Sequence, residues 1–156
     1  MDVRTLMHQA VINHGDRECV AHVERRLTFN EAWLRGVRLA NALLAMNLQP
    51  GDRVGVLEDN SIEAADFFHG MAIANLVRVP LYPRNGAEAH RHMLSHTGCK
   101  ALMVSQNYLH EVEGINQQVP SLDSILVRDD GYEDWLSSHS DVLPDIAVHP
   151  DDNFII

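Results

Sequence analysis

Three histidines and one cysteine near the middle of the chain are the residues whose types and spacing could do chemistry. They are His90, His92, His96 and Cys99. His92 and His96 stand four residues apart, so on a helix they share a face and could bind one metal ion together. No acidic ligand accompanies them, and Cys99 lies beyond Gly98, where we expect the helix to end. Because a structural zinc site normally needs four protein ligands, the pattern favours a solvated helix face.

Two further residues invite a functional interpretation. His69 stands beside Phe67 and Phe68 and could line a substrate tunnel, but a partly buried histidine with a satisfied ring is the favoured interpretation. Ser61 precedes a helical pattern and could be mistaken for a nucleophile. No histidine and acid stand at a readable spacing from it, so helix capping explains it.

Acidic and glycine residues give no stronger signal. An acidic cluster near Tyr132 and Trp135 suits a solvated turn and helix start, because carboxylates favour helix N-termini; it comprises Asp129, Asp130, Glu133 and Asp134. Neither a G-x-G-x-x-G pattern nor a Walker A pattern is present, and Gly51 and Gly55 are spaced as turn and strand residues. We therefore assign no catalytic, cofactor-binding or metal-binding residue.

Length, composition and charge bound the class of protein. A chain of 156 residues with 46% hydrophobic and 22% charged residues fits one folded domain over residues 1–156. The net charge of −10 argues against nucleic acid or an anionic membrane as the main partner. No apolar run reaches the roughly 20 residues of a membrane span, and no signal-peptide core begins the chain, so we expect a cytoplasmic protein. Cys19 and Cys99 are expected to be reduced and buried.

The stretch over residues 49–61, QPGDRVGVLEDNS, organises the predicted fold. Its Pro-Gly-Asp begins as a turn, and the apolar run over residues 53–57 is typical of a strand buried on both faces. Asn60 is expected to cap the next helix, with Glu63 completing a capping box. Amphipathic helical patterns flank the strand on both sides. This helix–strand–helix order predicts an α/β fold with a mainly parallel sheet.

The remaining elements follow from periodicity and capping signals. A hairpin is expected from strands over 18–23 and 27–29, broken at Arg25-Arg26, and Thr28 with Glu31 forms a capping box for a helix to about Met46. Asn47 and Asn75 stand where a left-handed cap ends a helix. Asn85 and Glu88 suggest a third capping box. The other predicted elements are helices over 3–13, 61–74, 86–97 and 131–137, a helix capped by Ser105, and strands over 76–81, 100–104, 124–127 and 152–156.

The predicted last strand ends at Ile156 without a loop after it. Open α/β sheets bind ligands in the loops that follow the carboxyl ends of their strands. We therefore expect a truncated chain that lacks its ligand loop.

A series of short motifs, each weak alone, resembles the N-terminal part of the AMP-forming acyl-CoA synthetases. They are Leu27-Thr28-Phe29 with Glu31, residues 50–54 (PGDRV), Asn60-Ser61, residues 79–83 (VPLYP) and Glu88. The likeness runs from about Thr5 to Ile156, and residues 151–156 look like the strand that leads into the family's Ser/Thr/Gly-rich phosphate loop. Asn47 and Asn75 depart from the family's glycines, although asparagine tolerates the same backbone.

The resemblance implies the N-terminal subdomain of an acyl-CoA synthetase-like fold. The parent enzyme would use ATP, magnesium and CoA to adenylate a carboxylic acid, with a fatty acid favoured, and then form its thioester. None of the family's catalytic positions matches a residue of this chain, because they all lie beyond Ile156. The chain alone is therefore expected to be inactive, to pack against the remainder of its polypeptide, and to self-associate through uncovered apolar surface.

Two other classes stay open from the residues alone. The chain could be a complete, non-catalytic α/β module that binds a partner or self-associates, although its Phe-Ile-Ile end lacks a cap or polar tail. It could also be a small nucleotide-binding domain, against which the absence of a Gly-rich phosphate loop counts.

Overall fold

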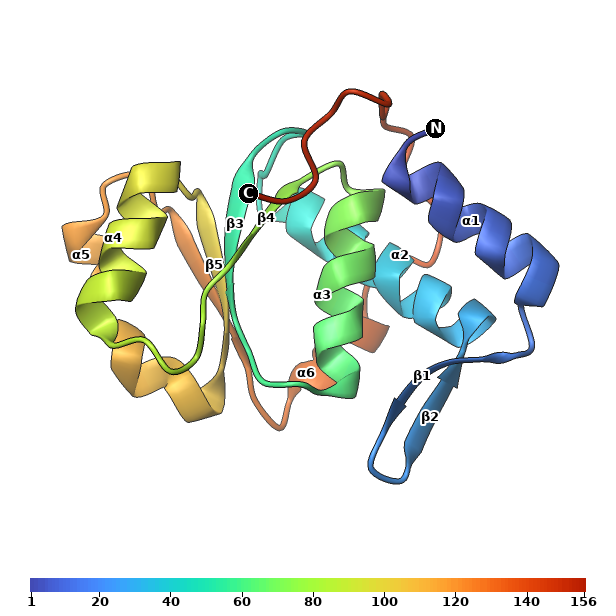
Figure 1. Ribbon diagram of the computed structural model, residues 1–156, viewed down its shortest axis with the longest axis horizontal. Coiled ribbons are helices and arrows are strands. Elements are labelled where there is room, and N and C mark those ends of the chain that lie inside the picture. The colour runs from blue at the N-terminus through green and yellow to red at the C-terminus, as the bar shows by residue number, and fades with distance from the viewer.

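The predicted organising strand, β3 (Arg53–Leu57), lies inside a four-stranded parallel sheet (Figure 1). The computed structural model describes residues 1–156. The strand order is β4-β3-β5-β6, where β4 is Val77–Pro80, β5 is Ala101–Ser105 and β6 is Ser124–Arg128. The residues of β3 from Val54 to Leu57 are all buried, as the apolar run predicted. The α/β class and the parallel sheet are thus confirmed.

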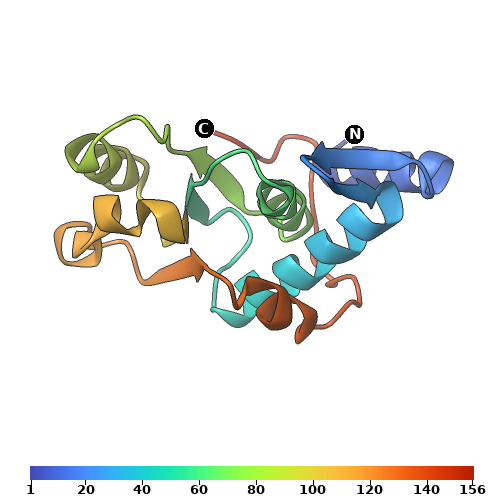
Figure 2. The same ribbon diagram turned by 90° about the horizontal axis from the view of Figure 1, so that it is seen from below.

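Helices cover both faces of this sheet (Figures 1 and 2). One face carries α2 (Phe29–Ala45), α3 (Ile62–Ile73) and α6 (Tyr132–Ser137), and its core is centred on residues such as Leu43, Val56 and Phe67. The other face carries α4 (Ala87–Thr97), the 3-10 helix η1 (Gln106–Val112) and α5 (Ile115–Gln118). Gly55 lets α4 approach closely, because a Cβ there would lie 2.4 Å from Leu94 Cδ2.

An outer layer of α1 (Val3–His14) and a β-hairpin packs beyond α2. The hairpin joins β1 (Glu18–His22) to β2 (Arg25–Thr28) in antiparallel pairing, which confirms the predicted antiparallel element. The expected break at Arg25-Arg26 is wrong, because both residues belong to β2 and the turn falls at Val23 and Glu24. Val23 adopts a left-handed φ of 52°, which the turn requires and which no glycine signals in the sequence.

The capping predictions are confirmed at Thr28, Ser61 and Ser105 and are wrong at Asn60 and Asn85. The box of Thr28 and Glu31 is present, with Glu31 N donating to Thr28 Oγ1 and Thr28 N donating to Glu31 Oε2. At α3 the cap is Ser61, whose hydroxyl accepts from Ala64 N at 3.0 Å, and not Asn60. Glu63 does not complete a capping box with Asn60, because its carboxylate forms an ion pair with Arg25. At α4 the cap is Gly86 without a side-chain bond, so the predicted box of Asn85 and Glu88 is wrong too.

The helix ends match the prediction. Asn47, Asn75 and Gly98 adopt left-handed φ values of 67°, 54° and 65°. The segment after Ser105 differs, because it forms a 3-10 helix to Val112 and a separate α5, where one helix was expected. Gly114, with a φ of 67°, separates the two.

A long irregular connection, the return segment (residues 138–153), brings the chain from α6 to the outer edge of β4 (Figure 1). There residues 154–156, the C-terminal segment, add a single parallel bridge between Ile155 and Arg78. The predicted last strand is therefore present only as this bridge. None of the helices combines the length and the hydropathy that crossing a bilayer requires.

Candidate functional site

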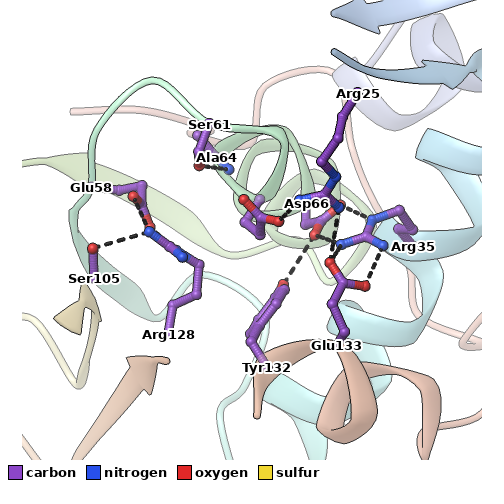
Figure 3. A network of polar contacts seen from close by, with 11 residues as sticks. Arg25, Arg35, Glu58, Ser61, Ala64, Asp66, Ser105, Arg128, Tyr132 and Glu133 are labelled. Carbon is purple, nitrogen blue, oxygen red and sulfur yellow. Dashed lines mark hydrogen bonds and ion pairs between the residues drawn. The ribbon is translucent and has the colours of Figure 1, made fainter. Parts of the chain in front are cut away.

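The carboxyl edge of the parallel sheet carries a three-residue polar cluster. Glu58 directly follows β3, Ser105 ends β5 and Arg128 ends β6. Arg128 Nε donates to Glu58 Oε2 at 2.6 Å and its Nη2 donates to Glu58 Oε1 at 2.9 Å and to Ser105 Oγ at 3.0 Å (Figure 3). This is the edge at which open α/β sheets bind their ligands.

The negative charge of the Glu58 carboxylate is already paired with Arg128 within this cluster. Its side chain is only 2% exposed, and the bidentate guanidinium occupies both of its oxygens. The hydrogen bond to Glu58 raises the pKa of Arg128. With no histidine bonded to Ser105 or to Ser61, neither hydroxyl is activated as a nucleophile. The cluster therefore stabilises the edge and offers no free acid, base or nucleophile.

The same edge carries a second pair nearby, in which the Tyr108 hydroxyl donates to Asp59 Oδ1. This hydrogen bond raises the pKa of Tyr108, because only the protonated phenol can donate it. Tyr108 belongs to η1, so the pair connects the loop after β3 with the loop after β5.

A larger ion-pair network lies between α2, α3 and α6. Arg35 donates from Nε to Asp66 Oδ1 at 2.7 Å and from Nη2 to Asp66 Oδ2 at 2.6 Å, and it reaches Glu133 Oε2 from Nη1 at 2.7 Å (Figure 3). The Asp66 side chain is fully buried, and that of Arg35 is 15% exposed. The Tyr132 hydroxyl donates to Asp66 Oδ2 at 3.2 Å.

The hairpin joins this network through Arg25, which pairs with Glu63 and with Glu133. Burial raises the pKa of Asp66, because the loss of water outweighs the attraction of Arg35. The hydrogen bond from Arg35 lowers the pKa of Glu133, and burial raises that of Tyr132. Each charged group has a partner, so the network joins the hairpin and three helices and exposes no reactive group.

A cavity of about 520 Å³ lies at the opposite, amino edge of the sheet. Its walls come from the start of β3 and β4 and from the return segment, including Arg53, Asn75, His149 and Asp151. Ligands of open α/β sheets bind at the other edge. The cavity therefore reflects how the return segment passes over the sheet.

The histidine cluster separates into two environments. His92 and His96 are exposed and stack with ring centroids 5.6 Å apart, as expected for a solvated helix face. For His90 the expectation of a solvated side chain is wrong. Its ring is fully buried, and neither ring nitrogen has a hydrogen-bond partner. Cys99 is buried as predicted, whereas Cys19 is only half-buried.

Replacing His90 by leucine is expected to raise the free energy of unfolding at pH 7 by about 1 kcal/mol, because two unpaired buried nitrogens disappear. Burial lowers the pKa of His90, so the folded chain keeps it neutral while the unfolded chain protonates near the ordinary value of 6.5. Wild-type stability should therefore fall as pH drops below about 6.5, and His90→Leu should remove this part of the slope.

Urea unfolding at several pH values measures both effects. Exposed His92→Leu is the matched control and should change stability by less than about 0.5 kcal/mol. A loss of stability in His90→Leu would show that His90 has a partner that stabilises it.

The other predicted residues behave as ordinary structural groups. His69 is half-buried, and its Nδ1 lies 2.7 Å from Ala65 O, which confirms the satisfied-histidine interpretation. Asp129 Oδ1 accepts from Gly131 N in the solvated turn before α6. Glu133 does more than predicted, since it also pairs with Arg25 and Arg35.

The donor groups of the chain do not form a site that fits magnesium. No three histidine, cysteine, aspartate or glutamate side chains gather closely enough to hold a metal ion. The one buried carboxylate at the ligand edge, Glu58, is bound by Arg128. No step through magnesium is thus assigned to residues of this chain.

Geometry and sequence together define the class: an open, parallel α/β sheet whose carboxyl edge is polar but carries no catalytic set. The model of the AMP-binding enzyme family matches residues 7–156, so the chain belongs to the AMP-binding enzymes. This confirms the resemblance to the adenylate-forming ligases.

Known proteins similar to the chain are much longer. A fatty acid–[acyl-carrier-protein] ligase, ScoC, from Streptomyces coeruleorubidus is 30% identical over 120 residues, covering 77% of this chain and 23% of that protein. A medium-chain-fatty-acid–CoA ligase from Ectopseudomonas oleovorans is 24% identical over 98% of this chain and 29% of its own length. The chain spans between 3% and 29% of the length of similar curated proteins.

A solved structure supports the fold at the level of the whole chain. The N-terminal domain of FACL13 from Mycobacterium tuberculosis superposes with a TM-score of 0.90 at 24% identity, covering all of this chain and 41% of that domain. The chain thus has the fold of an N-terminal part of an acyl-CoA ligase.

Proposed function

We propose that the chain is the N-terminal subdomain of an ATP-dependent acyl-CoA synthetase. The family match over residues 7–156 carries this proposal. In the parent enzyme, the carboxylate of an acid attacks the α-phosphorus of ATP, and pyrophosphate leaves. The thiolate of CoA then attacks the acyl carbon, and AMP leaves with the bonding electron pair of the C–O bond that breaks. Adenylation thereby converts a poor leaving group into a good one.

Within that enzyme the chain supplies structure and no reacting group. Residues 154–156 run parallel to β4, so the chain beyond Ile156 would emerge towards the edge that carries Glu58, Ser105 and Arg128. A loop that binds phosphates at this edge would be in the place that open α/β sheets use. The subdomain would support that loop and contribute to the acyl-binding side.

A fatty acid is the substrate class that we favour. ScoC and the Ectopseudomonas enzyme are named for fatty acids, but other similar proteins include a 3-hydroxybenzoate/4-hydroxybenzoate–CoA ligase and the phosphinothricin tripeptide synthetase PhsC. Amino acids and aromatic acids are therefore the competing substrates in any test.

The test is acid-dependent exchange of pyrophosphate into ATP by the full-length protein of the natural reading frame. Fatty acids of several lengths, benzoates and amino acids are compared, and CoA thioester formation is followed in parallel. We expect exchange and thioester formation with fatty acids, and neither with the 156-residue chain alone. Exchange by the isolated chain would contradict the assignment of all catalytic residues to the rest of the enzyme.

We also infer that the isolated chain self-associates. Phe68, Ile155 and Ile156 are large apolar residues with exposed fractions of 39%, 52% and 53%. Phe68 also contacts Phe154 edge-on, with ring centroids 4.9 Å apart, so these residues lie in one region beside α3 and β4. Sedimentation should show dimers or larger species for the chain, and Phe68→Ser should shift them towards monomer.

A further inference from the structure

Asn75 does more than end α3. Its φ of 54° is a conformation that glycine adopts with less strain, so the backbone alone gives no reason for asparagine. Its side-chain Nδ2 donates to Ala147 O at 3.1 Å and to Asp152 Oδ2 at 2.9 Å. Both acceptors belong to the return segment, more than 70 residues further along the chain.

Asp152 is itself fixed by its own turn. The same Oδ2 accepts from His149 N at 2.8 Å, and Asp152 N donates to His149 O at 3.1 Å. The hydrogen bonds that its carboxylate accepts from His149 N and from Asn75 lower the pKa of Asp152 below its ordinary value of 3.8. Asn75 therefore donates to an ionised oxygen in a closed turn, which strengthens the hydrogen bond.

The C-terminal segment needs such a contact because its own pairing is weak. Only two hydrogen bonds join it to β4: Arg78 N donates to Phe154 O at 2.8 Å, and Ile156 N donates to Arg78 O at 3.1 Å. Ile155 and Ile156 are both half exposed, and Phe154 alone of the segment packs against the core, so burial selects the register through one side chain only. A strand held so loosely could slip along its neighbour.

The Asn75–Asp152 contact and the Arg78–Ile155 bridge share one register. Asn75 stands three residues before Arg78, and Asp152 stands three residues before Ile155. Two parallel segments with equal spacing between their contacts cannot slip past one another while the Asn75–Asp152 contact holds. The contact therefore selects the pairing seen in the structure.

We propose that Asn75 is a positioning residue, which sets the register of residues 154–156 on β4 and, through it, the position of the ATP phosphate loop. This inference rests on the proposed function, in which that loop follows Ile156. A displacement of about 1 Å at a reacting group can cost up to a hundredfold in rate, so a change of register should affect catalysis strongly.

Asn75→Gly is a clean test, because glycine keeps the left-handed backbone and removes only the amide. Asn47→Gly is its matched control: Asn47 has a φ of 67° at the end of α2, and its side chain makes no hydrogen bond in the structure. Asp152→Asn should fall between wild type and Asn75→Gly, because its amide oxygen can still accept from Asn75 but carries no charge. Asp152→Ala should resemble Asn75→Gly.

Two readouts are measured on the full-length protein: hydrogen exchange of peptides covering β4 and residues 154–156, and the kinetics of adenylation. For Asn75→Gly we expect exchange of the Arg78 and Ile156 amides to accelerate about tenfold and the KM for ATP to rise about tenfold, with the KM for the acid unchanged. Asn47→Gly should stay within about twofold of wild type in both readouts.

Exchange in Asn75→Gly no faster than in Asn47→Gly would overturn the inference. Faster exchange with an unchanged KM for ATP would overturn the positioning role while leaving the contact in place. If wild type adenylates no acid, the proposed function fails together with the positioning role, and the exchange rates still decide whether the contact sets the register.

Discussion

Arg35→Met is expected to lower the free energy of unfolding by about 3–5 kcal/mol, the largest stability loss of any single substitution considered for this chain. Asp66 is fully buried and would lose the two hydrogen bonds that Arg35 donates at 2.6 and 2.7 Å. Only the Tyr132 hydroxyl would remain on its carboxylate. A buried carboxylate without a cation is far more costly than the loss of a surface pair.

Urea unfolding at pH 7 and at pH 4.5 measures the effect. The loss should shrink at the lower pH, because burial raises the pKa of Asp66 and the variant can then neutralise this carboxyl by protonation. Arg35→Met combined with Asp66→Asn should recover at least half of the loss. A cost below about 1 kcal/mol, as for an exposed pair such as Arg26–Glu18, would contradict the assignment of Arg35 as the partner of a buried charge.

Arg128→Met should be nearly as damaging, at about 3 kcal/mol, because it strands the Glu58 carboxylate, whose side chain is 2% exposed. Ser105 would also lose a donor at 3.0 Å. Since the cluster joins the ends of β3, β5 and β6, the carboxyl edge of the sheet should loosen first.

Hydrogen exchange of the loops after β3, β5 and β6, together with thermal unfolding, distinguishes a local from a global effect. Glu58→Gln with Arg128→Met should recover most of the stability, because the uncompensated charge is removed. Arg91→Met is the control, because Arg91 is a half-buried arginine of α4 that forms no ion pair, and it should change stability by less than about 0.5 kcal/mol. A change in stability for Arg128→Met as small as that of this control would contradict the prediction, because it would mean that the Glu58 carboxylate finds another partner.

The sequence predicted the sheet because its signals there are local. The apolar run of β3, the left-handed asparagines and the Thr28–Glu31 box each involve residues at most a few positions apart. The same local reasoning failed at α3, because Asn60 and Ser61 are adjacent and both can cap a helix. The ion pair between Glu63 and Arg25 depends on tertiary packing, which the local sequence does not show. Propensity alone cannot decide between two adjacent capping residues.

The polar clusters were missed because they join distant parts of the chain. Glu58 and Arg128 are 70 residues apart, and Arg35 and Glu133 are 98 apart. One signal could have found the first pair: each residue follows a predicted parallel strand, and the carboxyl ends of parallel strands meet at one edge. The burial of His90 had no such signal, since the pattern of α4 does not fix which side faces η1.

In the proposed parent enzyme, the chain would contribute a framework to a reaction carried out elsewhere in the same polypeptide. Its carboxylates and arginines neutralise one another between helices and strands, and its return segment carries the chain back to the edge of β4. Substitutions in this part should change stability, loop position and binding of ATP more than the chemistry itself.

The sequence of the natural reading frame immediately after the Ile156 codon tests this account most directly. We predict that the frame continues with a Ser/Thr/Gly-rich loop that contains a lysine, at the edge of the sheet where Glu58, Ser105 and Arg128 lie. A stop codon directly after Ile156 would contradict it, and the chain would then be a free-standing, non-catalytic α/β module.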